Sequence, residues 1–175
     1  MSLRRLSSVL LLLCIFHGPA WGARVPTAIE FRAAYCHRIM QWSVQQLKSS
    51  RNVLEQELQA RRGGDSLPAR NAGLSDETLQ DLLLRTRKEA ADERAVMEKL
   101  KQYLAARLPD LESAALRAAR QRADADIQEV AKLNSKCGFR CVHGPNFEAC
   151  LMEKCGGTDL LRRYRGCRNP RWLEF

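Results

Sequence analysis

The chain has 175 residues, the size of one ordinary domain, of which 45% are hydrophobic and only 6% aromatic. Its 10 glycines and 6 prolines are too few for a collagen-like, Pro/Gly-rich disordered or turn-rich all-β protein. The 29 Lys and Arg residues outnumber the 20 Asp and Glu residues, for a formal charge of +9. We therefore expect a basic, all-α protein.

The N-terminus has the pattern of a secretory signal peptide, which we predict over residues 1–22. Arg4-Arg5 precedes an apolar run from Val9 to Phe16, and the small-x-small triplet Ala20-Trp21-Gly22 follows it. The run is too short for a bilayer, which requires about 20 apolar residues. We expect cleavage after Gly22, an extracellular protein, and no transmembrane segment in the mature chain.

Cleavage at this point removes Cys14 and leaves an even number of cysteines. An even count in a secreted chain predicts three disulfides, for which fifteen connectivities are possible. Five of the six cysteines lie between residue 137 and the C-terminus. The predicted disulfide cysteines are Cys36, Cys137, Cys141, Cys150, Cys155 and Cys167.

The first predicted helix begins at Thr27, where Thr27-x-x-Glu30 is typical of a capping box. Its end is expected at Arg61-Arg62-Gly63-Gly64, with cations for the last turn and a glycine able to adopt the left-handed conformation. Steps of three and four residues between apolar side chains indicate one buried face. That face is formed by Ala33, Cys36, Met40, Leu47, Leu54 and Leu58.

Two further helices are predicted after a loop over residues 63–74. The first is capped by Ser75, with Leu74 against Leu79 as a hydrophobic staple, and runs to Pro109. Its apolar face is Leu79, Leu83, Ala90, Met97, Leu100, Leu104 and Leu108. The second runs from Asp110 to about Ser135 and has an alanine-rich face that favours close packing. That face is Leu111, Ala115, Ala119, Ala123, Ile127, Val130 and Leu133.

Cys36 constrains the arrangement, because it is the only mature cysteine outside the C-terminal cluster and must pair with that cluster. Helices rise about 1.5 Å per residue, so a plain up-down-up bundle would place Cys137 at the wrong end. Either the first helix breaks near Ser49-Ser50 or the tail folds back along the bundle. We favour the break, giving a bundle of three to four amphipathic helices over residues 23–135. Residues 136–175 would form a disulfide-rich, loop-rich basic extension, packed at the Cys36 end as one unit with the bundle.

No residue pattern predicts catalysis or a cofactor. His37 and His143 each lie near a cysteine, but thiols in a secreted protein are normally oxidised, which argues against zinc binding and against a cysteine nucleophile. No serine lies in a Gly-x-Ser-x-Gly motif. The dibasic pair Arg61-Arg62, placed in a plausible loop, leaves open a processed peptide precursor. A secreted enzyme without a recognisable motif is a further alternative.

The C-terminal segment combines five arginines with two aromatic residues and is our candidate binding surface. Arginine forks bind sulfate, phosphate or carboxylate, and aromatic rings stack beside them. An extracellular or cell-surface protein, an anionic glycan or another acidic surface would be the partner, and nucleic acid is not expected. A generally basic, solubilising tail is the alternative. The residues are Arg162, Arg163, Tyr164, Arg165, Arg168, Arg171 and Trp172.

A predicted secreted helical body ending in Cys137-x3-Cys141-x8-Cys150, with Cys155 soon after, resembles the helix-to-hinge junction of Izumo-type sperm surface proteins. That family typically has a Cys-x2-Cys near the mature N-terminus, where this chain has Cys36 alone. The resemblance implies a gamete-surface recognition role without catalysis. From the residues themselves, we expect a secreted, disulfide-stabilised helical protein that acts by binding as a ligand, toxin-like effector or surface-recognition factor.

Overall fold

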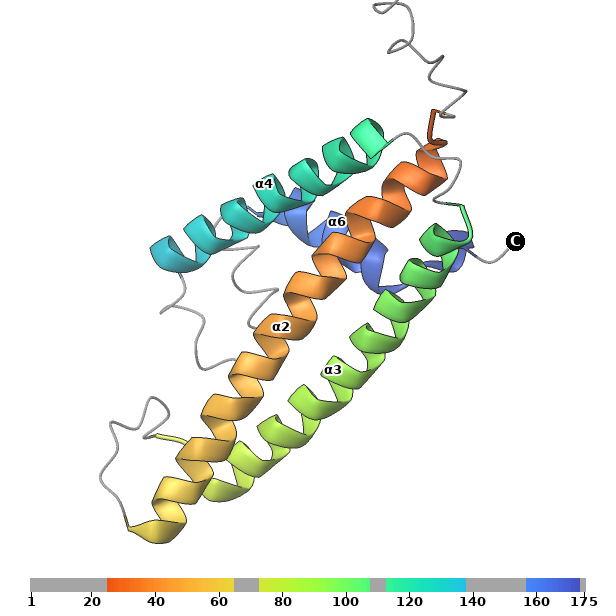
Figure 1. The fold of residues 1–175 in the computed structure, drawn as a ribbon. Coiled ribbons are helices and arrows are strands. Elements are labelled where there is room, and N and C mark those ends of the chain that lie inside the picture. The colour runs from red at the N-terminus through yellow and green to blue at the C-terminus, as the bar shows by residue number, and fades with distance from the viewer. Residues whose placement is uncertain (1–24, 65–72, 108–112, 138–156, 174–175) are drawn as a thin grey trace, which may run out of the picture.

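The computed structural model describes residues 25–64, 73–107, 113–137 and 157–173, and these residues form an all-α bundle without strands (Figure 1). Its α-helices are α2 (Ala28–Gly63), α3 (Asp76–Ala105), α4 (Ser113–Cys137) and α6 (Thr158–Arg168). A short 3-10 helix, η3 (Arg171–Leu173), follows α6. The predicted signal peptide lies outside the described residues. None of the described helices is long and apolar enough to cross a membrane.

Helix α2 begins and ends as predicted. The Thr27 amide donates a 2.7 Å hydrogen bond to Glu30 Oε2, and the Glu30 amide donates one of 3.3 Å to Thr27 Oγ1, which completes the capping box. At the other end Gly64 adopts φ 73°, the left-handed conformation that glycine reaches without steric cost. Both signals are local in sequence, which is why the boundaries of this helix were predictable.

The predicted break near Ser49-Ser50 is wrong, because α2 continues through both serines as one helix of 36 residues. Neither serine carries a backbone restriction of the kind that proline imposes, and both are exposed, so the hydrogen-bond ladder has no reason to stop there. The alternative arrangement is the observed one. The tail folds back along the bundle and reaches Cys36.

Helix α3 is capped by Ser75, whose Oγ accepts a 3.2 Å hydrogen bond from the Thr78 amide. Leu74 packs on a small cluster of Leu58, Leu79 and Leu83, as expected for the staple. The helix ends at Ala105, and the predicted turn near Pro109 lies outside the described residues. Helix α4 extends two residues beyond the predicted end at Ser135.

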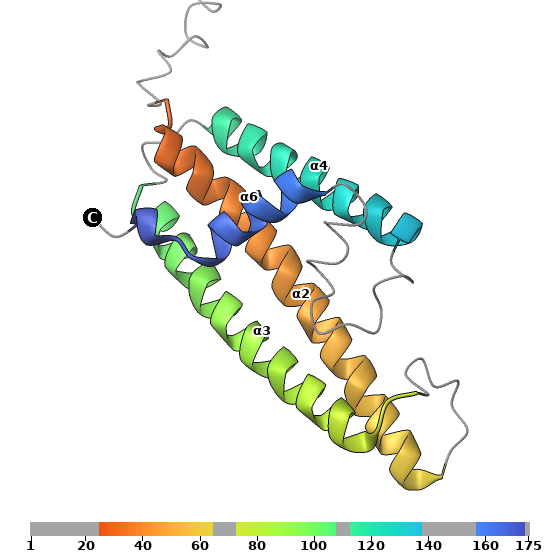
Figure 2. The same ribbon diagram turned by 180° about the vertical axis from the view of Figure 1, so that it is seen from behind.

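The long helices α2 and α3 form an antiparallel pair, and α4 crosses the half of α2 nearer its N-terminus (Figures 1 and 2). Helix α6 lies on the face of α2 between α3 and α4, which Figure 2 shows from the front. The main core is fully buried at Ala33, Met40, Leu100, Ala119 and Ala123. The alanine face predicted for α4 is therefore part of the core, and it allows α4 to pack closely on α2.

The C-terminal segment is more helical than predicted, since α6 occupies residues expected to be loop. Cys36 is bonded to Cys167, 131 positions later, as the isolation of Cys36 in the sequence required. The tail is thus packed at the Cys36 end of the bundle. Cys141, Cys150 and Cys155 lie outside the described residues, and the side chain of Cys137 is not among those described.

Candidate functional site

The candidate binding surface lies mainly on α6, which is amphipathic across its short length. Asp159 in its first turn and Arg165 and Arg168 in its last turn suit the helix dipole. Leu160 and Cys167 are buried, so the face that carries them points into the bundle. Because helical neighbours recur every three to four residues, Arg163 and Tyr164 share this inner face.

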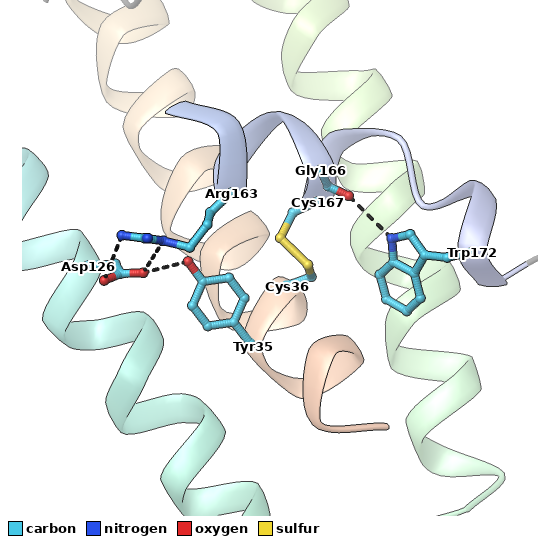
Figure 3. The surroundings of a disulfide bond; sticks show 7 residues. All are labelled: Tyr35, Cys36, Asp126, Arg163, Gly166, Cys167 and Trp172. Atoms are coloured by element: carbon cyan, nitrogen blue, oxygen red, sulfur yellow. Dashed lines mark hydrogen bonds and ion pairs between the residues drawn. A yellow bond between two sulfur atoms is a disulfide. The ribbon is translucent and has the colours of Figure 1, made fainter. Parts of the chain in front are cut away.

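Arg163 is engaged by a buried carboxylate on α4 (Figure 3). Its Nε lies 3.0 Å from Asp126 Oδ2, and the Tyr35 hydroxyl donates a 2.7 Å hydrogen bond to the same oxygen. Asp126 is only 3% exposed, so this ion pair compensates a carboxylate that would otherwise be costly to bury. Burial, and then the bond to Asp126, raise the pKa of Tyr35 well above its ordinary value. Tyr35 therefore remains a neutral donor, and the cluster joins α2, α4 and α6.

Tyr164 and Arg168 are engaged by a second buried carboxylate, Glu93 of α3, which is 2% exposed. The Tyr164 hydroxyl donates to Glu93 Oε1 at 2.8 Å, and Arg168 Nε lies 2.8 Å from the same oxygen. Since the single phenolic proton is used in that bond, the Ser43 hydroxyl donates to the Tyr164 oxygen, at 2.5 Å. Arg168 also forms an ion pair with Glu89. These contacts fix α6 against α2 and α3.

Trp172 is half-buried where η3 closes over the bundle. Its Nε1 donates a 3.3 Å hydrogen bond to the Gly166 carbonyl, drawn in Figure 3, and the Arg32 guanidinium lies 4.7 Å from its ring centroid. Arg32 also lies close to Gly166, where an added Cβ would be only 3.2 Å from Arg32 Nη2. A glycine at this position therefore leaves room for the guanidinium. Trp172 thus contributes to the attachment of the tail.

Arg162, Arg165 and Arg171 are the exposed members of the candidate binding surface. Arg162 forms an exposed pair with Asp159 at 2.9 Å and leaves 81% of its side chain accessible. The seven residues therefore divide by role. Arg163, Tyr164, Arg168 and Trp172 hold the segment on the bundle, while these three arginines face solvent.

The residues that receive the tail, Glu93 and Asp126, were missed in the sequence. Both lie in register with apolar faces: Glu93 falls between Ala90 and Met97, and Asp126 follows Ala123 by three residues. An acid in the apolar stripe of a helix indicates a buried charge that requires a basic partner. That signal was available, although it did not identify the partner.

A cavity of about 400 Å³ opens beside the disulfide, between α2, α4 and α6. Its inner wall is formed by Phe31, Tyr35 and the Cys36–Cys167 bond, and four arginines surround it. Those arginines are Arg32, Arg122, Arg162 and Arg163. Both cysteines of this wall are joined in the disulfide, and the Tyr35 hydroxyl donates its proton to Asp126.

Two other predicted features lie elsewhere. Arg61-Arg62 belongs to the last turn of α2, as the predicted helix end requires, so the loop position assumed for processing at this pair is wrong. Arg61 donates to the Leu74 carbonyl at 2.7 Å and pairs with Glu57 and Asp76, each at 3.0 Å. His37 is half-buried, and burial followed by the nearby Arg120 lowers its pKa. Within the described part of the chain, no group of three potential metal ligands is found.

Comparisons with known proteins identified no relative of this chain. No protein-family model, no curated protein and no solved structure matches the chain.

Proposed function

We propose that this chain is a secreted, disulfide-stabilised helical protein that acts by binding an extracellular or cell-surface partner and not by catalysis. The observation that supports this most directly is the attachment of α6. One disulfide and two buried carboxylates hold its inner face, while Arg162, Arg165 and Arg171 stay exposed. The tail is therefore a positioned basic surface rather than a loose one.

The physical advantage of this arrangement is preorganisation. A binding segment that is already ordered loses less conformational entropy on association than a flexible tail does. Exposed arginines on a fixed helix suit carboxylate or sulfate groups, which they bind through paired N–H donors. We propose an acidic protein surface or anionic glycan as the partner, and we assign Cys137, Cys141, Cys150 and Cys155 to further disulfides within the tail.

The Izumo-type resemblance remains a narrower proposal within the same class. The resemblance depends on tail cysteines whose side chains lie outside the described residues. The contacts within the bundle therefore support a binding role in general and not the Izumo-type role in particular. Processing at Arg61-Arg62 is less favoured, because cleavage there requires the last turn of α2 to unwind and Arg61 to release its partners.

A charge-reversal experiment on the full-length secreted protein tests this proposal. The labelled protein is titrated onto immobilised heparin, as a sulfated glycan probe, and onto intact cells. The test variant is Arg165→Glu with Arg171→Glu, and the matched control is Lys88→Glu with Arg94→Glu on α3. All four side chains are exposed, and both variants change the charge by the same amount.

We expect the native protein to bind saturably and the test variant to lose about tenfold or more in affinity. Each lost charge-assisted contact is worth roughly 1 kcal/mol or more. The control variant should bind nearly as well as the native protein. Equal losses in both variants would show that total charge governs binding, and the fixed surface on the tail would then be rejected.

A further inference from the structure

We propose that the cavity beside the Cys36–Cys167 disulfide binds an anionic amphiphile, a small molecule with one carboxylate or sulfate head group and an apolar tail. The inference rests on the proposed function and deepens it, because it names a ligand class and a site distinct from Arg165 and Arg171. The cavity volume of about 400 Å³ lies within the range of small-ligand sites, about 300 to 1,000 Å³.

The inner wall of the cavity supplies the apolar contact. Phe31 leaves 37% of its surface exposed although it belongs to a tightly packed part of α2. Tyr35 and the disulfide continue this wall, and both cysteines are only 1% exposed. Figure 3 shows the Tyr35 ring lying next to the Cys36–Cys167 bond. An alkyl chain placed here would cover mainly the part of Phe31 that is now in water, which is favourable in proportion to the area removed.

Tyr35 is uncharged in this wall. Its hydroxyl is committed to Asp126 at 2.7 Å, and burial together with this bond raises its pKa. Tyrosine is already neutral at physiological pH, so the wall carries no phenolate there. A neutral wall of this kind does not repel an anion at the mouth of the cavity.

The mouth supplies the positive charge. Arg163 pairs with Asp126 at 3.0 Å, whereas Arg122 lies farther from that carboxylate, at 3.6 Å, with 58% of its side chain exposed. Arg162 forms an exposed pair with Asp159. Four arginines line the cavity when Arg32 is included, and the carboxylates that pair with them are Asp126 and Asp159.

The geometry leaves arginine donors available to a head group. The Arg32 guanidinium carbon lies over the Trp172 ring, 4.7 Å from its centroid, and the guanidinium carries five N–H donors. Arg122 likewise uses one terminal nitrogen toward Asp126 and has further donors. A carboxylate or sulfate between Arg32 and Arg122 would accept paired hydrogen bonds of the kind that arginine forms best.

The shape favours a small molecule over a protein segment. A stable protein interface buries about 1,200 Å² or more, mostly over a broad and nearly flat area. This site is far smaller, about 400 Å³, and its walls are tied together by the disulfide and by the Arg163–Asp126–Tyr35 cluster. Walls held in this way need little reorganisation to accept a ligand.

The experiment uses isothermal titration calorimetry on the folded, full-length secreted protein with decanoate as the probe, below its micelle concentration. Decyl maltoside tests the apolar tail without charge, decyltrimethylammonium tests the opposite charge, and acetate tests the head group alone. The site variants are Phe31→Ser and Arg122→Gln. Their matched controls are Leu84→Ser and Arg94→Gln, which alter an exposed leucine and an exposed arginine of α3.

We expect one decanoate site, with the three comparison probes at least about tenfold weaker, because neither apolar burial nor charge alone reproduces the pair of contacts. Each site variant should weaken decanoate binding by about fivefold or more, as lost apolar area or a lost charged donor predicts. The control variants should stay within about twofold, since exposed side chains outside the site make no such contact. Circular dichroism verifies that all four variants remain folded.

Several results would overturn the cavity proposal. These are absence of decanoate binding, equal binding of decyl maltoside, or equal losses in site and control variants. Displacement of decanoate by a much tighter acidic peptide carrying one phenylalanine would assign the cavity to a protein segment instead. The variant Arg165→Glu with Arg171→Glu separates the two proposals. If it loses cell binding but keeps decanoate affinity, both stand, whereas native protein that binds cells but not decanoate fails only the cavity proposal.

Discussion

The disulfide between Cys36 and Cys167 should contribute a large part of the stability of this protein. It joins residues 131 positions apart, and in the chain-entropy model closure of such a loop lowers unfolded-state entropy by the equivalent of about 5 kcal/mol at room temperature. The dependence is logarithmic, so further disulfides in the tail that shortened the loop to about 100 residues would reduce this value only to about 4.7 kcal/mol. The expected contribution is comparable to the total stability of many domains, about 5 to 15 kcal/mol.

The variant Cys36→Ala with Cys167→Ala tests this value without leaving an unpaired thiol from this bond. Urea unfolding followed by far-ultraviolet circular dichroism should show a loss of about 3 to 5 kcal/mol, the lower end allowing for native strain and residual unfolded structure. The folded variant should remain helical, because Asp126 and Glu93 still bind Arg163 and Arg168. A loss below about 1 kcal/mol would refute the reasoning, since the tail would then be held by its polar contacts alone.

Three further predictions concern the bundle and the secreted form. Glu93→Ala should lower the free energy of unfolding in urea by about 3 kcal/mol, because it removes the buried partner of Arg168 and Tyr164. The control Glu89→Ala, at a side chain that is 44% exposed, should lower it by less than about 1 kcal/mol. The free energy of unfolding should fall as pH drops through about 6.5, because burial and then Arg120 lower the pKa of His37, so the unfolded chain binds its proton first. Urea unfolding across this pH range should show the slope, and His37→Gln should flatten it. Protein secreted from mammalian cells should begin at Ala23 and show no free thiol by intact mass, whereas two or more alkylatable thiols would contradict full oxidation.

The helix boundaries could be predicted because their signals are local. Thr27, Ser75 and Gly64 each act through hydrogen bonds or dihedral angles within one turn of the helix end. The pairing of Cys36 with the tail was also predictable, from the number and position of the cysteines alone. The path by which the tail reaches Cys36 could not be predicted, because it depends on how long α2 remains helical. A helix boundary at Ser49-Ser50 was predicted only because a break there would bring the C-terminal cysteines to Cys36.

The contacts of the tail could not be predicted for a different reason. Arg163 and Asp126 are 37 positions apart in the chain, and Arg168 and Glu93 are 75 apart. No periodicity within α6 identifies these partners. The acids themselves were detectable as charges within apolar faces, but many basic residues were available to pair with them. Only the crossing of α6 over α2 selects Arg163 for one acid and Arg168 for the other.

This selection changes the meaning of the basic segment. In sequence, its five arginines form one cationic surface, but in the fold Arg163 and Arg168 neutralise buried acids and add little to the field outside the protein. The positive charge available to a partner therefore comes from Arg162, Arg165 and Arg171, together with Arg32 and Arg122 from other helices around the cavity. A peptide that copies residues 158–173 would have all five arginines but neither the buried acids nor the cavity. Such a peptide should bind anions with less selectivity than the protein, because its charges would be mobile and would lack an apolar wall beside them.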